Sequence, residues 1–157
     1  MLACLERRHI GRYIRCVNGL IIKGGNVWKI KVLLADDQAD MRQIIKAIVE
    51  NSGADVVAEA ENGEEAIQKY IEHKPHLTLL DINMPVIDGA AALRAIREVN
   101  PQACVIMLTA DNKTEMVRQC VALGARAYVL KNNTPDAIAS EILAGWDGYL
   151  NKACGLK

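Results

Sequence analysis

The sequence predicts an α/β fold, a doubly wound parallel sheet of five strands with helices on both faces. Short apolar runs alternate five times with segments whose apolar residues recur at helical spacing. The connections are short, and parallel neighbours need a crossover such as a helix. The runs are nearly continuous in apolar residues, which is typical of strands covered on both faces. These observations favour one domain with a sheet between two helical layers.

The predicted strands are five apolar runs, each five to eight residues long, at residues 29–36, 55–60, 76–81, 103–109 and 126–130. The predicted helices follow them at residues 38–53, 63–74, 89–100, 112–124 and 134–145. Gly53 is a stop signal for the first helix, and Pro101 ends the third. The last helix has Thr134 as its N-cap and Pro135 at its first position, and Gly145 is predicted to end it.

The domain is predicted to cover residues 29–150, with a basic extension at residues 1–28 and a tail at residues 151–157. Residues 1–29 carry six basic residues and one acid, so the rest of this formally neutral chain is acidic. An acidic body is a poor non-specific ligand for nucleic acid, and we expect no direct nucleic-acid binding. No window reaches the roughly 18 consecutive apolar residues of a membrane span, so no membrane association is expected.

The extension lacks the continuous apolar region of a signal peptide. A nucleic-acid-binding arm is one hypothesis for it. A second is that residues 1–26 come from a mis-annotated start, because codons for Lys23-Gly24-Gly25 can read as a ribosome-binding sequence before a GTG start at Val27. An N-terminal peptide beginning at Met1 in the natural protein would contradict this second hypothesis.

The five cysteines form no CxxC pair and show no metal-like spacing. An odd count with two members in apolar segments indicates small reduced thiols, which predicts a cytoplasmic protein.

Polar residues stand where four of the five predicted strands end. Each alone is an ordinary strand-end or capping residue. In a parallel sheet, however, all carboxyl ends meet at one rim, where ligands bind. The first strand ends in Asp36 and Asp37, the third in Asp81 and the fourth in Thr109, which is followed by the small Ala110, and Lys131 follows the fifth. Their coincidence predicts a site at this rim.

Three carboxylates within ~4 Å would repel by several kcal/mol per pair at an effective dielectric of about 20. They need a cation, and oxygen ligands with an incomplete protein shell favour Mg²⁺. A lysine and a hydroxyl beside the metal are what a phosphoryl group needs. Asp81, at the centre, can then act as the nucleophile and form an acyl phosphate.

This set of residues, with the stretch Asp81-Ile-Asn-Met-Pro-Val-Ile-Asp-Gly89, resembles the receiver domain of two-component response regulators over residues 30–148. The resemblance implies the flavodoxin-like (βα)5 fold with strand order 2-1-3-4-5. It implies that Asp81 accepts a phosphoryl group from a sensor histidine kinase or a histidine phosphotransfer protein. Asp37, Asp81 and the backbone carbonyl of Asn83 would bind Mg²⁺, and Asp36 would assist through water.

The resemblance also implies that Lys131 pairs with the phosphoryl group and that Thr109 hydrogen-bonds it. Asn83, Met84 and Ala110 would line the phosphate pocket, and Asn83 and Asp111 would tune the lifetime of the acyl phosphate. Tyr128 would swing inward when Thr109 moves. The alternative for Tyr128 is a core aromatic with a solvated hydroxyl.

One departure concerns the residues after Lys131. Many receivers continue with a proline in a cis bond, whereas Asn132-Asn133 stand here. A cis bond without proline costs roughly 2.5–4 kcal/mol, so a trans bond is predicted. Lys-Asn-Asn-Thr-Pro resembles the branch of regulators that carries a helix-turn-helix output domain.

The function expected is a phosphorylation-dependent switch and not a turnover enzyme. Phosphorylation would change the surface formed by the helices at residues 112–124 and 134–145 and the strand at residues 126–130, which would bind a downstream protein. A homodimer formed on phosphorylation is a further expectation. Three alternatives stay open: the receiver part of a truncated helix-turn-helix regulator, a Mg²⁺-dependent phosphohydrolase with an aspartyl nucleophile, and a phosphate-independent interaction module. The phosphohydrolase is disfavoured because Asn83 stands where such enzymes usually have a second acid.

Overall fold

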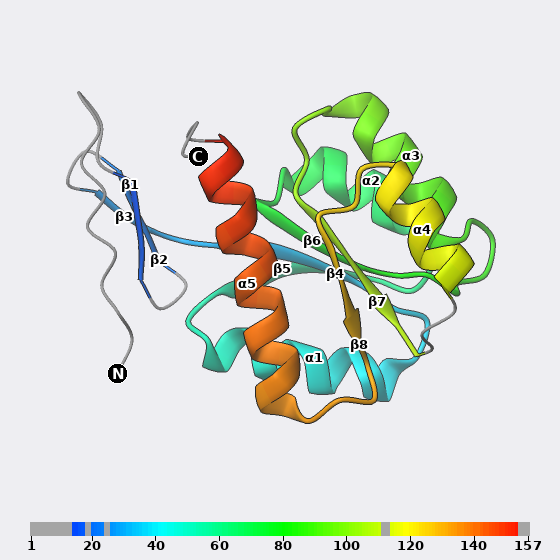
Figure 1. The fold of residues 1–157 in the computed structure, drawn as a ribbon, viewed down its shortest axis with the longest axis horizontal. Coiled ribbons are helices and arrows are strands. Elements are labelled where there is room, and N and C mark those ends of the chain that lie inside the picture. The colour runs from blue at the N-terminus through cyan, green and yellow to red at the C-terminus, as the bar shows by residue number, and fades with distance from the viewer. Residues whose placement is uncertain (1–13, 18–19, 24–25, 111–113, 154–157) are drawn as a thin grey trace.

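The computed structural model describes residues 14–17, 20–23, 26–110 and 114–153, and its main feature is a five-stranded parallel sheet (Figure 1). The strands are β4 (Lys31–Ala35), β5 (Asp55–Ala60), β6 (Leu77–Asp81), β7 (Val105–Thr109) and β8 (Ala127–Leu130). Their order is β5-β4-β6-β7-β8, and all pairs are parallel. With β4 counted as the first strand, this order is 2-1-3-4-5. The predicted fold class is confirmed.

Five helices cover the two faces of this sheet: α1 (Ala39–Asn51), α2 (Gly63–His73), α3 (Gly89–Val99), α4 (Thr114–Ala122) and α5 (Pro135–Ala153). Successive strand residues point to opposite faces, so the core divides into two clusters. Leu34 and its face of the sheet pack with residues of α1 and α5, whereas Leu33 and the other face pack with α2, α3 and α4. The doubly wound arrangement therefore buries the central strands on both sides.

Two helices begin at residues whose side chains act as caps, and one of these, Thr134, was predicted. The hydroxyl of Thr134 accepts a hydrogen bond from the backbone N–H of Ala137 at 3.3 Å. The carboxylate of Asp88 accepts one from the N–H of Ala91 at 2.8 Å, which starts α3. Each side chain satisfies a helix N–H group that has no intrahelical acceptor.

The prediction that Gly145 ends the last helix is wrong, because α5 continues to Ala153. The glycine serves close packing instead of termination. A Cβ placed at Gly145 would lie 2.8 Å from Cδ1 of Ile106 and 3.0 Å from Cβ of Ala127. Beyond it, Trp146 is buried in the core and stacks on Tyr149 with ring centroids 5.4 Å apart. This packing of the second half of α5 outweighs the low helix propensity of glycine.

Two glycine-to-alanine changes in α5 should therefore have opposite effects on stability. Gly145→Ala is expected to lower the free energy of unfolding by about 1 kcal/mol, because overpacking of 1–3 kcal/mol exceeds the gain in helix propensity. A Cβ at Gly148 would meet nothing within 4 Å. Gly148→Ala should therefore stabilise the protein by about 1 kcal/mol. Urea unfolding of both variants measures the difference, and equal stabilisation by the two would contradict the packing role of Gly145.

A second sheet precedes the first in the chain and was not predicted. It consists of β1 (Ile14–Val17), β2 (Leu20–Lys23) and β3 (Asn26–Lys29), paired antiparallel in the order β1-β2-β3. The missed signal is in the sequence: the pairs Asn18-Gly19 and Gly24-Gly25 separate three short apolar runs. Such pairs are typical of two-residue hairpin connections.

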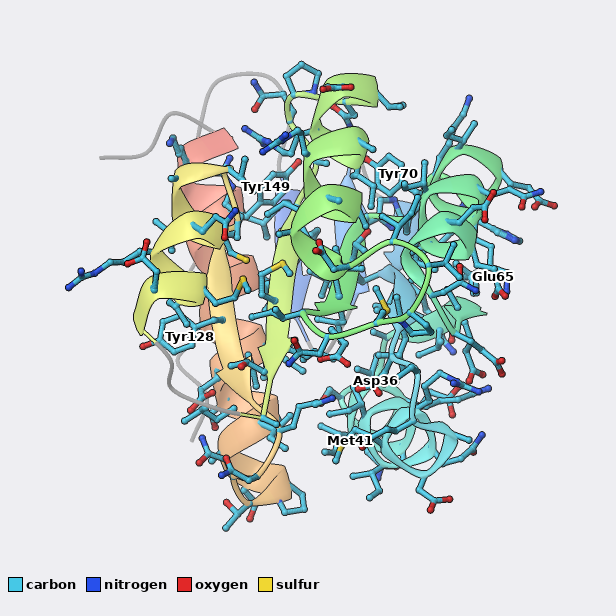
Figure 2. The ribbon with its side chains drawn as sticks, turned by 90° about the vertical axis from the view of Figure 1, so that its right-hand side faces the viewer. Asp36, Met41, Glu65, Tyr70, Tyr128 and Tyr149 are labelled. Carbon is cyan, nitrogen blue, oxygen red and sulfur yellow. The ribbon has the colours of Figure 1, made fainter. Side chains whose placement is uncertain are left out.

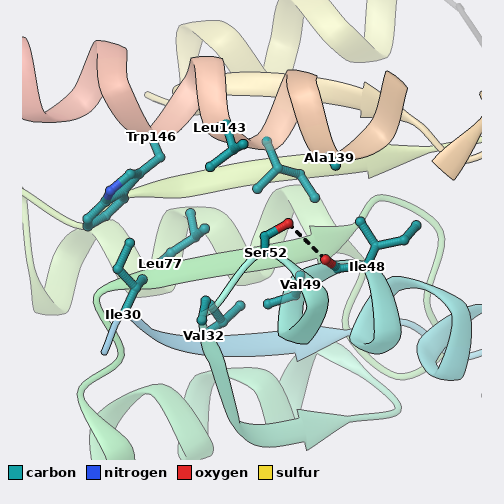
Figure 3. Close-up of a pocket in the computed structure, with 11 residues that line it drawn as sticks. Ile30, Val32, Ile48, Val49, Ser52, Leu77, Ala139, Leu143 and Trp146 are labelled. Atoms are coloured by element: carbon teal, nitrogen blue, oxygen red, sulfur yellow. Dashed lines mark hydrogen bonds between the residues drawn. The ribbon is translucent and has the colours of Figure 1, made fainter. Parts of the chain in front are cut away.

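An apolar cavity of about 30 Å³ lies between α1, α5 and the amino ends of β4 and β6 (Figure 3). Val32, Leu77 and Leu143 are among its lining residues, and the Ser52 hydroxyl beside it donates to the carbonyl of Ile48 at 2.9 Å. Because the cavity lies at the opposite ends of the strands from the polar rim and has an apolar lining, it is not suited to an anion or a metal ion. In the described part of the chain, no helix combines the length and apolar character needed to cross a bilayer.

Candidate functional site

The carboxyl ends of four adjacent strands bring the predicted polar residues to one rim. Asp36 follows β4, Asp81 ends β6, Thr109 ends β7 and Lys131 follows β8. All four side chains are buried, and the exposed fraction is 0% for Asp36, 2% for Asp81 and 8% for Lys131. Charged groups are rarely buried to this degree unless they are paired. Residues up to 95 positions apart in the chain are therefore held in one polar cluster.

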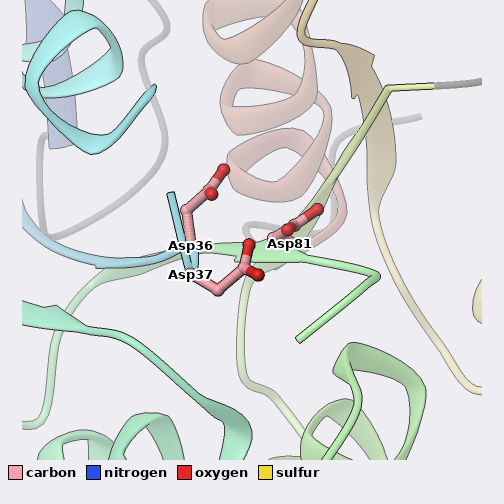
Figure 4. Close-up of side chains that lie close together, drawn as sticks. All are labelled: Asp36, Asp37 and Asp81. Carbon is pink, nitrogen blue, oxygen red and sulfur yellow. The ribbon is translucent and has the colours of Figure 1, made fainter. Parts of the chain in front are cut away.

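Three carboxylates converge at this rim, as Figure 4 shows for Asp36, Asp37 and Asp81. One oxygen from each lies within 4.8 Å of the others. Asp37 is exposed, whereas the other two are buried, so the group is open to solvent on one side. An all-oxygen donor set with an open side fits a hard cation such as Mg²⁺, which keeps several of its waters.

Lys131 contacts the two buried carboxylates of the site. Its Nζ lies 2.8 Å from Oδ2 of Asp36 and 3.2 Å from Oδ1 of Asp81. Burial by itself would lower the pKa of Lys131, but the hydrogen bond and charge of Asp36 and the charge of Asp81 outweigh it, so the pKa is raised. The ammonium group therefore stays charged and holds both carboxylates in place. Lys131 therefore lies at the rim with the acids, where the ends of the predicted strands indicated.

Asp81 is a carboxylate whose ionised form is disfavoured in the folded protein. Burial raises its pKa to about 6, and the charge of Asp36 adds to this effect. Lys131 and a backbone hydrogen bond from Asn83 act in the opposite direction but do not cancel it. At neutral pH the group is ionised against a free-energy cost, and an added cation would relieve that cost.

The loop after Asp81 is held close to it at both ends. A Cβ at Gly89 would lie 2.1 Å from the backbone carbonyl oxygen of Asp81, so only glycine fits this position. The N–H of Gly89 also donates to the carbonyl of Ile82 at 2.8 Å. Within the loop, Asn83 is exposed and Met84 is buried. Both lie next to Asp81 along the chain, where the phosphate pocket was predicted.

Two further predicted residues, Ala110 and Tyr128, are exposed. Ala110 is exposed and directly follows Thr109. Tyr128 is 47% exposed, and Figure 2 shows it at the periphery near α4, away from Asp36. It is therefore not a core aromatic in this conformation. Asp111 lies outside the described residues. No peptide bond among the described residues is cis, so the bond after Lys131 is trans as predicted.

Sequence reasoning missed one buried charge, Arg42. Its NH1 donates to the backbone carbonyl of Asp36 at 2.7 Å, and its side chain is buried. A signal was present, because Arg42 falls on the same stripe of α1 as the buried Ile45 and Val49. A charged residue on the apolar face of a helix indicates a buried partner.

Comparison with known proteins identifies the family. The model of the response regulator receiver domain matches residues 32–143. The chain belongs to the response regulator receiver family. This receiver is 41% identical over 112 residues to the chemotaxis protein CheY of Bacillus subtilis, a match that covers 71% of this chain and 93% of that protein. The chemotaxis protein CheY of Listeria monocytogenes is 44% identical over 109 residues, with 69% and 92% covered.

Solved structures of receivers show the same fold. A CheX-CheY-BeF3-Mg complex from Borrelia burgdorferi matches with a TM-score of 0.71 at 30% identity, over 74% of this chain and 88% of that one. The receiver domain of the response regulator NarL from Mycobacterium tuberculosis matches with a TM-score of 0.72 at 30% identity, over 76% and 98%. A longer relative, the transcriptional regulatory protein LnrK of Bacillus subtilis, is 32% identical, and 54% of its length is covered.

Proposed function

We propose that this receiver is a phosphoryl-accepting switch in which Asp81 is the acceptor. The observation that carries the proposal is the contact of Lys131 with both Asp36 and Asp81 at the rim where three carboxylates converge. An ionised carboxylate beside a fixed ammonium group is suited to attack phosphorus, because the ammonium group can neutralise the charge of the incoming phosphoryl group.

The step is a transfer from a phosphohistidine donor, on a sensor histidine kinase or a histidine phosphotransfer protein. An oxygen of Asp81 forms a bond to phosphorus while the bond from phosphorus to the imidazole nitrogen breaks, and the electron pair stays on that nitrogen. The ammonium group of Lys131 then pairs with the phosphoryl oxygens instead of the carboxylate of Asp81. Thr109, at the end of β7, donates a hydrogen bond to the same oxygens in this proposal.

A divalent cation, Mg²⁺, is the proposed cofactor, with Asp37, Asp81 and the carbonyl of Asn83 as its ligands and Asp36 acting through water. When bound, it supplies charge neutralisation for the acidic group and the phosphoryl oxygens. The raised pKa of Asp81 and the all-oxygen donor set support this assignment.

The proposed output is a change in the surface of α4, β8 and α5. Met116 and Val121 on α4 and Tyr128 on β8 are exposed apolar side chains, with 37%, 54% and 47% of their surface accessible. Such residues suit a protein partner better than nucleic acid. A switch of this kind works only if the phosphorylated form binds the partner better than the resting form. Homodimerisation on phosphorylation and a cytoplasmic location are part of this proposal.

The proposal does not include catalytic turnover on external substrates. Sustained hydrolysis of a phosphate ester would favour the phosphohydrolase alternative instead. The helix-turn-helix alternative depends on the gene downstream of Lys157, which would have to encode an output domain.

The proposal is tested with beryllofluoride, a mimic of the phosphoryl group, added together with Mg²⁺. In amide NMR spectra, we expect the unmodified receiver to shift signals around the rim and on β8 near Tyr128. The Asp81→Asn variant should show no such shift, because the neutral amide is not an acceptor. An identical response of the two proteins would show that Asp81 is not the acceptor.

A further inference from the structure

Arg42 is a buried charge that the proposed phosphoryl chemistry does not use. Six polar or charged side chains are buried among the described residues. Asp36, Asp81, Thr109 and Lys131 belong to the rim, and Thr78 lies in the sheet. Arg42, which is 9% exposed, is the sixth. Burial of a guanidinium group is unfavourable unless the group is paired and hydrogen-bonded. The partners of Arg42 therefore indicate its role.

The guanidinium of Arg42 joins the acidic turn to the edge of the sheet. NH1 donates to the backbone carbonyl of Asp36 at 2.7 Å, and NH2 donates to the carboxylate of Glu61 at 2.8 Å. Nε lies 3.8 Å from Oε2 of Glu59. Because Glu59 lies in β5 and Glu61 directly follows it, the planar fork of Arg42 fixes the turn after β4 against the neighbouring edge strand.

Asp36 is consequently held at four atoms by four partners. Its N–H donates to the carbonyl of Ala60 at 3.1 Å, and its own carbonyl accepts from Arg42. Its Oδ1 accepts from the N–H of Gln38 at 2.9 Å, and its Oδ2 accepts from Lys131 at 2.8 Å. Of these four hydrogen bonds, the bond from Arg42 is the one in which a charged side chain binds the backbone of Asp36.

That backbone bond has a consequence for Asp37. The carbonyl of Asp36 belongs to the planar peptide unit whose nitrogen is that of Asp37, so fixing the oxygen fixes the plane. The direction in which the exposed Asp37 side chain leaves the backbone then depends on the Arg42 contact. Asp37 is the member of the acidic group that faces solvent, and it has the most freedom to lose on binding a cation.

We propose that Arg42 is a positioning residue for the acidic site: it orients the Asp36–Asp37 peptide unit so that the carboxylates are preorganised for a divalent cation. This inference rests on the proposed function, since it assumes that the acidic group binds Mg²⁺. It concerns a residue that touches neither the cation nor the phosphoryl group.

The sign of the effect separates positioning from simple electrostatics. Removal of a positive charge near a cation site should tighten Mg²⁺ binding if only charge matters. Loss of a positioning contact should weaken it, and loss of an outer-shell contact typically costs 10–100-fold in metal affinity. We therefore expect Arg42→Met to weaken binding of Mg²⁺ by about tenfold.

The test is calorimetric titration with Mg²⁺ alone, without a phosphoryl donor, on variants shown to be folded by urea unfolding. Lys46→Met is the matched control: Lys46 lies one turn further along α1 and pairs with Glu59 at 2.6 Å, but its described contacts do not include Asp36. It should leave the affinity within about twofold of the unmodified protein or slightly tighter. Hydrogen exchange of the Asp36 amide, which donates to the carbonyl of Ala60, should rise in Mg²⁺-free Arg42→Met and not in Lys46→Met.

Arg42→Lys keeps the charge but not the fork, and it decides the matter if Arg42→Met does not fold. Its Mg²⁺ affinity should fall by about threefold or more. The proposal is overturned if the folded Arg42 variants bind Mg²⁺ as tightly as the unmodified protein or more tightly. If the unmodified protein itself binds no Mg²⁺, the proposed function fails, which is a different result.

Discussion

Replacement of Asp81 by asparagine is expected to raise the free energy of unfolding at pH 7.5, without Mg²⁺, by up to about 3 kcal/mol. The buried carboxylate has a pKa raised from 3.8 to about 6, so its ionised form is disfavoured in the folded protein. The asparagine side chain is nearly the same size and carries no charge. It removes repulsion with Asp36, and the Lys131–Asp36 pair stays intact.

The pH dependence gives the same prediction a second readout. A raised carboxyl pKa means that the folded state binds the proton more tightly than the unfolded state. Stability from this group is therefore fully present below about pH 4 and is lost as the pH rises through about 6. The unmodified protein should lose stability over this interval, relative to Asp81→Asn. Urea unfolding from pH 4 to 8 measures both curves.

A suitable control is Asp147→Asn, which changes an exposed carboxylate on α5. It should alter the free energy of unfolding by no more than about 0.5 kcal/mol. If Asp81→Asn were no more stable than this control at pH 7.5, burial would not disfavour the ionised form of Asp81 as the structure indicates.

Replacement of Lys131 by methionine should have the opposite effect and a larger one. Lys131 is the cation that contacts both buried carboxylates among the described residues. Without it, two buried negative charges lose their partner, and removal of one member of a buried pair costs about 3–5 kcal/mol. Methionine preserves most of the apolar stem, so the loss reports the charge. We therefore expect Lys131→Met to lower the free energy of unfolding by about 3–5 kcal/mol at pH 7.5 without Mg²⁺.

Mg²⁺ should then stabilise Lys131→Met by more than it stabilises the unmodified protein, because the ion supplies the missing positive charge. The matched control is Lys29→Met, which removes an ion pair of similar length, 2.9 Å to Asp55, that is about half exposed on both sides. An exposed pair contributes about 0–1 kcal/mol. A loss in Lys131→Met as small as in this control would contradict the role of Lys131 as the counter-charge of the site.

Much of this architecture is predictable because local signals and the global fold agree. Apolar runs and helical spacing predict the strands and helices, and the family resemblance implies the strand order. The strand ends predict Asp36, Asp81, Thr109 and Lys131. This works because the carboxyl ends of parallel strands share one rim. Capping residues such as Thr134 are also predictable, since a cap is a contact within a few residues.

The features that were missed depend on contacts between distant segments. Gly145 looks like a helix stop, but its role depends on how closely β7 and β8 approach α5. Arg42 falls on the apolar stripe of α1, but its partner is not readable from the sequence, because Glu61 comes close to it only when β5 pairs with β4. The strands between Ile14 and Lys29 had a local signal in their Gly-containing pairs, which the basic composition of the segment obscured.

The most direct test of the central claim is to identify the residue that carries the phosphoryl group. The protein is incubated with acetyl phosphate and Mg²⁺, and the acyl phosphate is reduced with borohydride before peptide mass spectrometry. The account predicts modification of Asp81, dependent on Mg²⁺ and abolished by EDTA. Modification of another residue, or none at Asp81 in folded protein with Mg²⁺ bound, would contradict it.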